Sequence, residues 1–242
     1  MSKINGLRVK IFADGADMDS ILELYRRPYI AGFTTNPTLM RKAGVTDYEA
    51  FCRKLLETIP DRPISFEVLA DDFAGMEAQA RKIASWGSNV YVKIPITNTR
   101  GESSCPLIER LSGSGLSINA TAMMTLNQVR DVSRALHPEV ASIVSIFAGR
   151  IADAGVDPIP IMAEALGILK ALPRAELLWA SPRELLNLVQ ADLVGCHIIT
   201  VTNDIMKKLL LLGKELDVFS LETVEMFYRD ALTAGYVIRT DH

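Results

Sequence analysis

The sequence predicts an α/β barrel of eight strand–helix units, and three observations predict it. Short apolar runs rich in β-branched residues alternate with longer amphipathic stretches, eight times over about 215 residues. The strand runs are almost continuously apolar, as is typical of parallel strands covered on both faces. A doubly wound open sheet is the alternative, but no Gly-x-Gly-x-x-Gly loop follows the first strand run.

Each unit can be placed on the chain. The expected strands are 7–14, 31–36, 64–69, 89–94, 116–121, 142–147, 176–180 and 197–202. The expected helices are 18–27, 46–58, 72–86, 103–113, 125–136, 159–171, 183–193 and 204–214. Helix starts are expected at Asp72, at Ser181 followed by Pro182, and at Asn203. Without a linker or composition break, the sequence predicts one (β/α)₈ TIM barrel domain over 1–242, with an additional C-terminal helix at about 219–234.

Composition excludes several classes of function. The hydrophobic fraction of 49%, the charged fraction of 23% and a net charge of −3 without a basic run argue against a nucleic-acid partner. No apolar stretch approaches the roughly 18–20 residues of a membrane span, and the N-terminus has no secretory pattern. Three scattered cysteines are typical of reduced thiols in a cytoplasmic protein. His137, His197 and His242 form no metal-ligand spacing, so neither a metal nor a cofactor is expected.

Lys93 lies inside the apolar run Asn89–Pro95, an unusual place for a hydrated ammonium group. Burial favours the neutral amine, which can attack a carbonyl carbon and form a Schiff base. The structural alternative is a strand-end lysine that extends its head group into solvent. Lys10 has the same Val-Lys-Ile flanks, but it lies four residues before its strand end, roughly 13 Å deeper at about 3.3 Å per residue. Depth in the strand therefore favours Lys93 as the reactive lysine.

Polar side chains gather at the carboxyl ends of the expected strands, where barrels of this kind carry their active sites. In strand order they are Asp14, Thr34 with Thr35 and Asn36, Glu67, Lys93, Asn119 with Thr121, Ser145 with Arg150, Ser181 with Arg183, and Thr200 with Thr202. Each alone has a structural explanation, such as a turn residue at Asp14 or a pre-proline residue at Asn36. Their joint placement on eight successive strands predicts a functional site.

These residues resemble the transaldolase family, and more closely its short members, which include fructose-6-phosphate aldolases. The resemblance covers nearly the whole chain, beginning at Ile11-Phe12-Ala13-Asp14. Its most specific pieces are Thr34-Thr35-Asn36-Pro37, Val92-Lys93-Ile94-Pro95, Asn119-Ala120-Thr121 and Ser145-Ile146-Phe147-Ala148-Gly149-Arg150. The resemblance implies a class I aldolase-type barrel and an enzyme that transfers a ketose fragment.

The resemblance also implies a role for each site residue. Lys93 would form an iminium with the C2 carbonyl of a ketose phosphate, and Asp14 would take the C4 hydroxyl proton. Glu67 and Thr121 would hold a water that carries protons. The dihydroxyacetone unit would be bound by Thr34, Asn36, Asn119, Ser145 and Phe147. The sugar phosphate would be bound by Arg150, Ser181 and Arg183, together with N–H groups of a helix starting near Pro182.

Three residues, Glu67, Phe147 and Asn119, together resemble a transaldolase and favour a transferase over an aldolase. Fructose-6-phosphate aldolases typically carry glutamine at Glu67 and tyrosine at Phe147, and the phenylalanine ring has no hydroxyl that could activate a water. The expected reaction is transfer of dihydroxyacetone between sedoheptulose 7-phosphate and glyceraldehyde 3-phosphate, as in the pentose phosphate pathway. Pro182 stands where many relatives have phenylalanine, so an aldolase, or a transaldolase for another sugar phosphate or sulfosugar, is the alternative. A non-catalytic barrel is disfavoured because no essential side chain is missing. The resemblance further implies a homo-oligomer, a pentamer or decamer.

Overall fold

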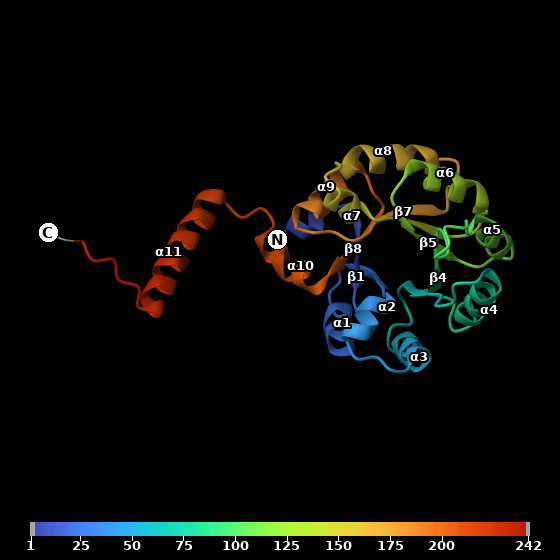
Figure 1. Ribbon diagram of the computed structural model, residues 1–242, viewed down its shortest axis with the longest axis horizontal. Helices are drawn as coiled ribbons and strands as arrows, with labels where there is room; N and C mark the ends of the chain where they lie inside the picture. Colours follow the sequence, from blue (N-terminus) through green and yellow to red (C-terminus); the bar gives the residue numbers. More distant parts are fainter. Residues whose placement is uncertain (1–2, 241–242) are drawn as a thin grey trace.

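Eight parallel strands close into a barrel in the order β1 to β8, and the last strand pairs with the first (Figure 1). The computed structural model describes residues 3–240. The strands are β1 (Lys10–Asp14), β2 (Ile30–Thr34), β3 (Ile64–Glu67), β4 (Val90–Pro95), β5 (Ile118–Met123), β6 (Ser142–Ile146), β7 (Ala175–Trp179) and β8 (Ile198–Thr202). The predicted fold class is confirmed, and the predicted strand ends differ by at most three residues, as at the start of β1.

Helices alternate with the strands, and all of them except the last, α11, surround the barrel (Figure 1). They are α1 (Met18–Tyr25), α2 (Pro37–Lys42), α3 (Tyr48–Thr58), α4 (Phe73–Ala84), α5 (Cys105–Gly113), α6 (Leu126–Ala135), α7 (Ala148–Asp153), α8 (Pro158–Leu169), α9 (Leu186–Val194), α10 (Asn203–Lys207) and α11 (Leu216–Ala234). Two of them, α2 and α7, were not predicted, because six residues are too few to show a helical period. The predicted helix 204–214 divides into α10 and a 3₁₀ turn at Lys208–Leu211.

Two predicted helix caps have different outcomes. Asp72 caps α4 as predicted, and its side-chain oxygen accepts the Gly75 N–H at 2.8 Å. The predicted helix start at Ser181 is wrong, because Ser181 has a left-handed φ of 62° and α9 begins only at Leu186. The backbone N–H groups of Arg183 and Glu184 instead donate to the side chain of Asn187. No helix N-terminus therefore points from Pro182 toward an anion.

Side chains that point into the barrel form layers. Phe12 of β1 packs with Ile143 of β6 and Leu178 of β7, although β1 is the neighbour of neither strand. Gly32 leaves room for the Phe12 ring, since a Cβ at Gly32 would lie 2.5 Å from it. This apolar layer fills the middle of the barrel and forms the floor beneath the polar ends of the strands.

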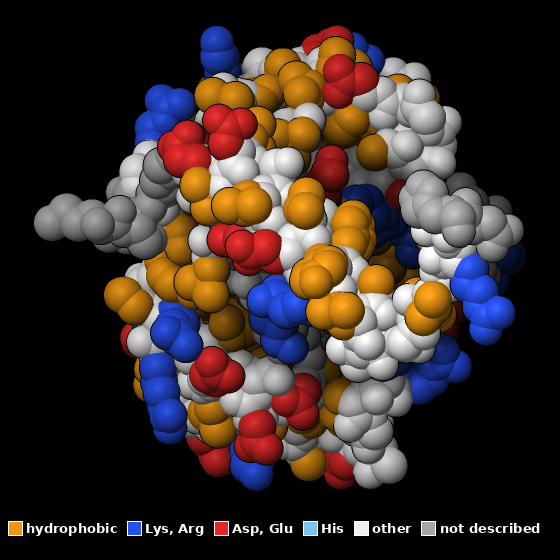
Figure 2. Space-filling view, turned by 90° about the vertical axis from the view of Figure 1, so that its left-hand side faces the viewer, with side chains coloured by type: hydrophobic (Ala, Val, Ile, Leu, Met, Phe, Trp, Pro, Cys, Tyr) orange, Lys and Arg blue, Asp and Glu red, His pale blue; other side chains and the backbone are white. Residues whose placement is uncertain are grey.

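Helix α11 leads away from the barrel, at the left of Figure 1, and none of its residues is buried. Figure 2 looks at the molecule from this side and shows hydrophobic side chains spread over it. Within residues 3–240, α11 included, no helix combines the length and the apolar character needed to cross a membrane. Residues 1–2 and His242, on which expectations about the N-terminus and metal ligands partly rested, lie outside the described range.

Candidate active site

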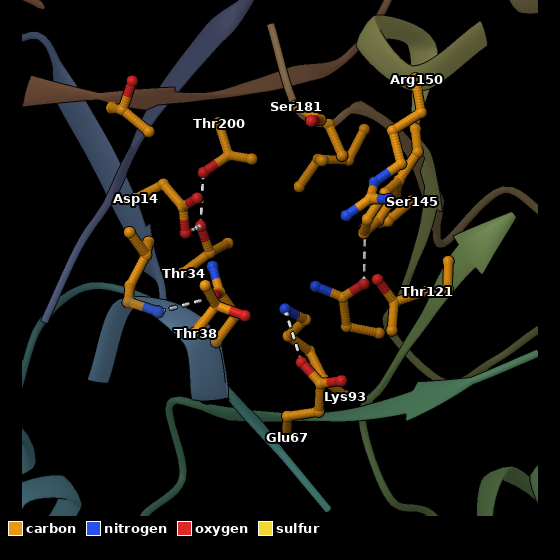
Figure 3. Close-up of a pocket in the computed structure, with 18 of the residues that line it drawn as sticks. Asp14, Thr34, Thr38, Glu67, Lys93, Thr121, Ser145, Arg150, Ser181 and Thr200 are labelled. Carbon is orange, nitrogen blue, oxygen red and sulfur yellow. Dashed lines mark hydrogen bonds and ion pairs between the residues drawn. The ribbon is translucent and has the colours of Figure 1, made fainter. Parts of the chain in front are cut away.

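A cavity of about 560 Å³ opens at the carboxyl ends of the strands, and all eight strands contribute to its wall (Figure 3). Every site residue predicted from the sequence lines this cavity. They are Asp14, Thr34, Asn36, Glu67, Lys93, Asn119, Thr121, Ser145, Phe147, Arg150, Ser181 and Arg183. The barrel thus brings together residues as far apart in the chain as Asp14 and Arg183.

Lys93 is buried in this cavity, with 6% of its surface exposed. Its Nζ donates to the Thr35 carbonyl oxygen at 2.9 Å and lies 3.1 Å from Glu67 Oε2. Lys10 has a different environment, because its half-exposed side chain pairs with Glu176 at 2.7 Å toward the opposite end of the barrel. The predicted difference in depth between the two lysines is confirmed.

The Lys93 amine and the Glu67 carboxylate form a pair on neighbouring strands. Their Cα positions are in register between β3 and β4, so strand pairing alone brings the two side chains together. Tyr48 fixes this end of β3, because its hydroxyl donates to the Glu67 carbonyl and accepts the Glu67 N–H. Burial raises the pKa of Tyr48, so the phenol stays neutral and keeps both bonds. A proton can pass from the ammonium to Glu67 over a single hydrogen-bond distance, which would leave a nucleophilic amine.

Asp14 faces Lys93 from β1 across the cavity and belongs to a hydroxyl chain (Figure 3). Thr34 Oγ1 donates to Asp14 Oδ1 at 2.8 Å, and the Thr34 hydroxyl is also hydrogen-bonded to the Thr200 hydroxyl. Burial raises the pKa of Asp14 above its ordinary value, although the positive charge of Lys93 and the hydrogen bond from Thr34 act in the opposite direction. A carboxyl group with a raised pKa is suited to both accepting and returning a proton.

Asn119 is fully buried between two serines. Ser145 Oγ donates to Asn119 Oδ1 at 2.7 Å, and Asn119 Nδ2 donates to Ser65 Oγ at 3.0 Å. One amide hydrogen and the remaining lone pairs of Ser145 are left to face the cavity. The group has the donors and acceptors that a hydroxylated substrate requires.

Thr121 and Asn36 occupy contrasting positions. The buried Thr121 hydroxyl has no hydrogen-bond partner among residues 3–240, and such a group is costly unless water or a ligand bonds to it. Asn36 is the N-cap of α2, since its Oδ1 accepts the Leu39 N–H at 2.9 Å. Its structural role as the cap before Pro37 is therefore real, and its side chain also hydrogen-bonds the Asp14 carboxylate, which opposes the rise in the Asp14 pKa.

Positive charge lies on the other side of the cavity from Asp14 (Figure 3). Arg150 is exposed on α7, and its guanidinium carbon lies 5.8 Å from the centre of the Phe147 ring. Arg183 forms an ion pair with Asp153 and donates from Nη1 to Ser181 Oγ at 2.8 Å. The predicted phosphate residues are thus adjacent, without the helix N-terminus expected at Pro182.

Several contributing residues were not selected from the sequence. Thr200 was noted as a strand-end residue, but its contact with Thr34 depends on β8 lying beside β1. Ser65 and Asp153 gave no sequence signal of a functional role, because a serine in a strand and an aspartate on the surface are both common. Lys42, at the end of α2, adds a further cation to the cavity wall. Among residues 3–240, no cluster of three or more His, Cys, Asp or Glu side chains has the arrangement of a metal site.

Known proteins that are similar in sequence belong to one enzyme family. The sequence profile of the Transaldolase/Fructose-6-phosphate aldolase family matches residues 11–236. The chain is 34% identical over 203 residues to a protein named Probable transaldolase from Dehalococcoides mccartyi, covering 84% of this chain and 90% of that one. It is also 34% identical over 203 residues to a Probable transaldolase from a Thermoanaerobacter species, covering 84% and 89% of the two chains.

Solved structures show the same fold at low sequence identity. A dihydrodipicolinate synthase from Rhodopseudomonas palustris has a TM-score of 0.50 and 13% identity, covering 93% of this chain and 80% of that one. This likeness concerns the barrel fold alone.

The family match spans almost the entire barrel and includes every residue of the cavity wall. The chain therefore belongs to the transaldolase/fructose-6-phosphate aldolase family.

Proposed function

We propose that this protein is a transaldolase, which transfers a dihydroxyacetone unit from a ketose phosphate to an aldose phosphate through a Schiff base on Lys93. The observation that carries the proposal is the buried Lys93 amine, 3.1 Å from a Glu67 oxygen and in the same cavity as Asp14. Family membership adds support, because the relatives carry the name Probable transaldolase.

The first step is formation of the iminium. Lys93 gives a proton to Glu67, and the neutral amine attacks the C2 carbonyl of the ketose to form a carbinolamine. Protonation of the carbinolamine hydroxyl lets it leave as water. The unpartnered hydroxyl of Thr121 and the Glu67 carboxylate are placed to hold a water that carries these protons.

The second step is cleavage of the C3–C4 bond. Asp14 accepts the C4 hydroxyl proton, and the bonding electrons pass into the iminium to give an enamine and a free aldose phosphate. A second aldose phosphate then adds to the enamine carbon, and Asp14 returns the proton to the new hydroxyl. Water hydrolyses the iminium and releases the product ketose.

The two ends of the substrate meet different groups. The dihydroxyacetone hydroxyls bind Asn119, Ser145 and Asn36, which all line the cavity. The phosphate binds at the cationic side that holds Arg150 and Ser181. Sedoheptulose 7-phosphate and glyceraldehyde 3-phosphate of the pentose phosphate pathway are the default pair, and the three free cysteines fit the reducing cytoplasm where that pathway operates.

Turnover should depend on the acceptor. Without an aldose phosphate the enamine has no partner, so fructose 6-phosphate alone should give little free dihydroxyacetone, and adding erythrose 4-phosphate should start sedoheptulose 7-phosphate formation. Phe147→Tyr places a hydroxyl in the cavity wall and should raise acceptor-independent release about tenfold or more, since a positioned proton donor accelerates enamine protonation.

Phe147→Leu is the matched control, because it changes the ring without adding a hydroxyl. Release of dihydroxyacetone by the wild type at the same rate with and without acceptor would instead identify an aldolase. Activity with only a sulfonated or otherwise modified ketose would point to a specialised donor. Pro182 lies in the cavity wall and could change the shape of the donor pocket, which is the reason for testing such ketoses.

We also propose that the protein is a homo-oligomer in which α11 packs on a second copy. Leu221, Val224, Tyr228 and Leu232 follow helical spacing along one face of α11, and each is at least 59% exposed. An exposed apolar face of this length is typical of an interaction site. Pentamers or decamers are the expected assemblies.

Leu221→Asp with Val224→Asp should shift the protein toward single chains, because each leucine-sized side chain buried at an interface contributes about 1.5–3 kcal/mol. Sedimentation velocity or light scattering measures the change in mass. Asp230→Lys, on the opposite face of α11, is the control and should leave the assembly intact. A wild-type protein that sediments as a single chain at high concentration would contradict the proposal.

A further inference from the structure

The hydrogen-bond ladder between β2 and β3 changes its pattern beside the cavity. At its start the bonds follow in steps of two residues. The Phe33 N–H donates to the Pro63 carbonyl at 2.9 Å, and the Thr35 N–H donates to the Ser65 carbonyl at 3.2 Å. Parallel strands continue such a series at even spacing. The next bond would therefore run from the Glu67 N–H to the Thr35 carbonyl.

The Thr35 carbonyl oxygen binds the buried lysine instead. Lys93 Nζ donates to this oxygen at 2.9 Å, and the same nitrogen lies 3.1 Å from Glu67 Oε2 (Figure 3). The amine is thus held between a neutral carbonyl and a carboxylate. Two contacts in different directions fix the place from which the nitrogen would approach a carbonyl carbon.

The Glu67 backbone also lacks its second ladder partner. By the same step of two residues, its carbonyl would accept an N–H from position 37, which is a proline and has none. Pro37 is the first residue of α2, so β2 has ended before this point. The N–H and the carbonyl of Glu67 therefore need another partner, because unpaired backbone groups are costly inside a protein.

One side chain satisfies both groups. The Tyr48 hydroxyl accepts the Glu67 N–H at 2.9 Å and donates to the Glu67 carbonyl at 2.7 Å. Tyr48 is the first residue of α3, and the N-cap Asp47 holds this end of the helix by accepting the Ala50 N–H at 3.0 Å. A phenol can donate only while it is neutral, and burial raises the pKa of Tyr48. The double bond is therefore kept throughout the neutral pH range.

We infer that Tyr48 is a positioning residue for the Lys93–Glu67 pair. By accepting the Glu67 N–H, it leaves the Thr35 carbonyl to Lys93 Nζ. By bonding both backbone groups of Glu67, it also fixes the strand end that carries the carboxylate. Tyr48 acts through these residues, and it is not among the residues that line the cavity. The inference rests on the proposed function in taking Lys93 as the reactive amine.

Tyr48→Phe removes the hydroxyl and keeps the ring, so the Glu67 N–H can return to the Thr35 carbonyl and compete with Lys93 for it. The probe is acetylacetone, a 1,3-diketone that condenses with a neutral lysine amine, with loss of one water, to an enaminone that absorbs in the near ultraviolet. Labelling of Lys93 should slow about 10- to 100-fold, because small displacements of a reacting group have effects of this size. Mass spectrometry of the peptides identifies the labelled lysine.

Three further variants separate positioning from stability. Leu55→Ala removes a fully buried side chain from the same helix, so it should lower the melting temperature and leave the labelling rate of the folded protein unchanged. Tyr25→Phe removes a phenol hydroxyl that bonds to Asp61 elsewhere and should also leave labelling unchanged. With 4-aminophenylalanine in place of Tyr48, a donor and a lone pair return, and labelling should be faster than in Tyr48→Phe. Circular dichroism melting gives the folded fraction of each protein.

The diketone needs no sugar, so this inference can fail independently of the proposed function. A wild type that is labelled on Lys93 but does not process ketose phosphates would overturn the function, and the same labelling rates would still decide the role of Tyr48. Equal labelling of the wild type and Tyr48→Phe would overturn the inference. An equal slowing by Leu55→Ala, no recovery with 4-aminophenylalanine, or a wild type that labels Lys93 no faster than Lys10 would overturn it as well.

Discussion

Replacing Lys93 by methionine is expected to lower kcat by about 10⁴-fold or more, because the reaction then has no amine to form the iminium. Methionine has a similar length and is readily accommodated in an apolar site, so the barrel should fold. The lost interactions of Nζ are those with Glu67 and the Thr35 carbonyl. Steady-state kinetics with fructose 6-phosphate and erythrose 4-phosphate measure the effect.

Lys10→Met is the matched control that the chain itself supplies. Lys10 has the same flanking residues but lies half-exposed at the other end of its strand, paired with Glu176. Its replacement should leave kcat within about twofold of the wild type, since exposed ion pairs contribute little. Borohydride reduction in the presence of fructose 6-phosphate should attach a sugar adduct to the Lys93 peptide in the wild type and in Lys10→Met, and to no peptide in Lys93→Met. Substantial turnover by Lys93→Met would refute the Schiff-base assignment.

Asp14→Asn should separate formation of the Schiff base from cleavage of the carbon–carbon bond. An amide cannot accept the C4 hydroxyl proton, so kcat should fall by about 10²- to 10⁴-fold. Lys93 and Glu67 are unaltered, and borohydride should still trap the sugar on Lys93. Loss of the adduct together with turnover would instead mean that Asp14 acts before or during imine formation.

The pH profile gives an independent readout of Asp14. Burial raises the pKa of this carboxyl, and cleavage requires its ionised form, so kcat should fall on the acid side at a higher pH than for an ordinary aspartate. The Thr34 hydrogen bond opposes this shift by favouring the charged form. Thr34→Val should therefore move the acid limb to still higher pH, whereas a limb that moves to lower pH would contradict the assigned contact.

Most of the candidate site could be predicted from the sequence, because the barrel topology determines where the residues at the strand ends lie. Once the sequence shows alternating strands and helices, the carboxyl ends of all strands must lie on one face, and polar residues there must share a cavity. Lys93 and Lys10 could be distinguished on this basis, since position along the strand decides which end of the barrel a side chain reaches. Asp14, Glu67 and Asn119 follow from the same reasoning.

Other features depend on contacts that sequence position does not reveal. The Arg183–Asp153 pair joins the segment after β7 to the end of α7, 30 residues away in the chain, and Ser181 has a left-handed φ where this segment packs against α7. The sequence pattern of Ser181 followed by Pro182 predicted a helix cap there, and local propensity was overridden by this packing. Helix α7 itself has only six residues, too few to show a helical period in the sequence.

The sequence alone determined the barrel, the cavity face and the lysine that is buried in it. The alternation of strands and helices fixes which strand ends share a face, and position along the strand fixes how close a side chain lies to that face. Only the tertiary structure decided the partners of those side chains. Thr34 meets Thr200 because the barrel closes β8 onto β1, and Arg183 meets Asp153 because α7 lies against the end of β7. Hydrogen bonds and ion pairs act over about 3 Å, and only the folded chain brings residues that are distant in sequence to that separation.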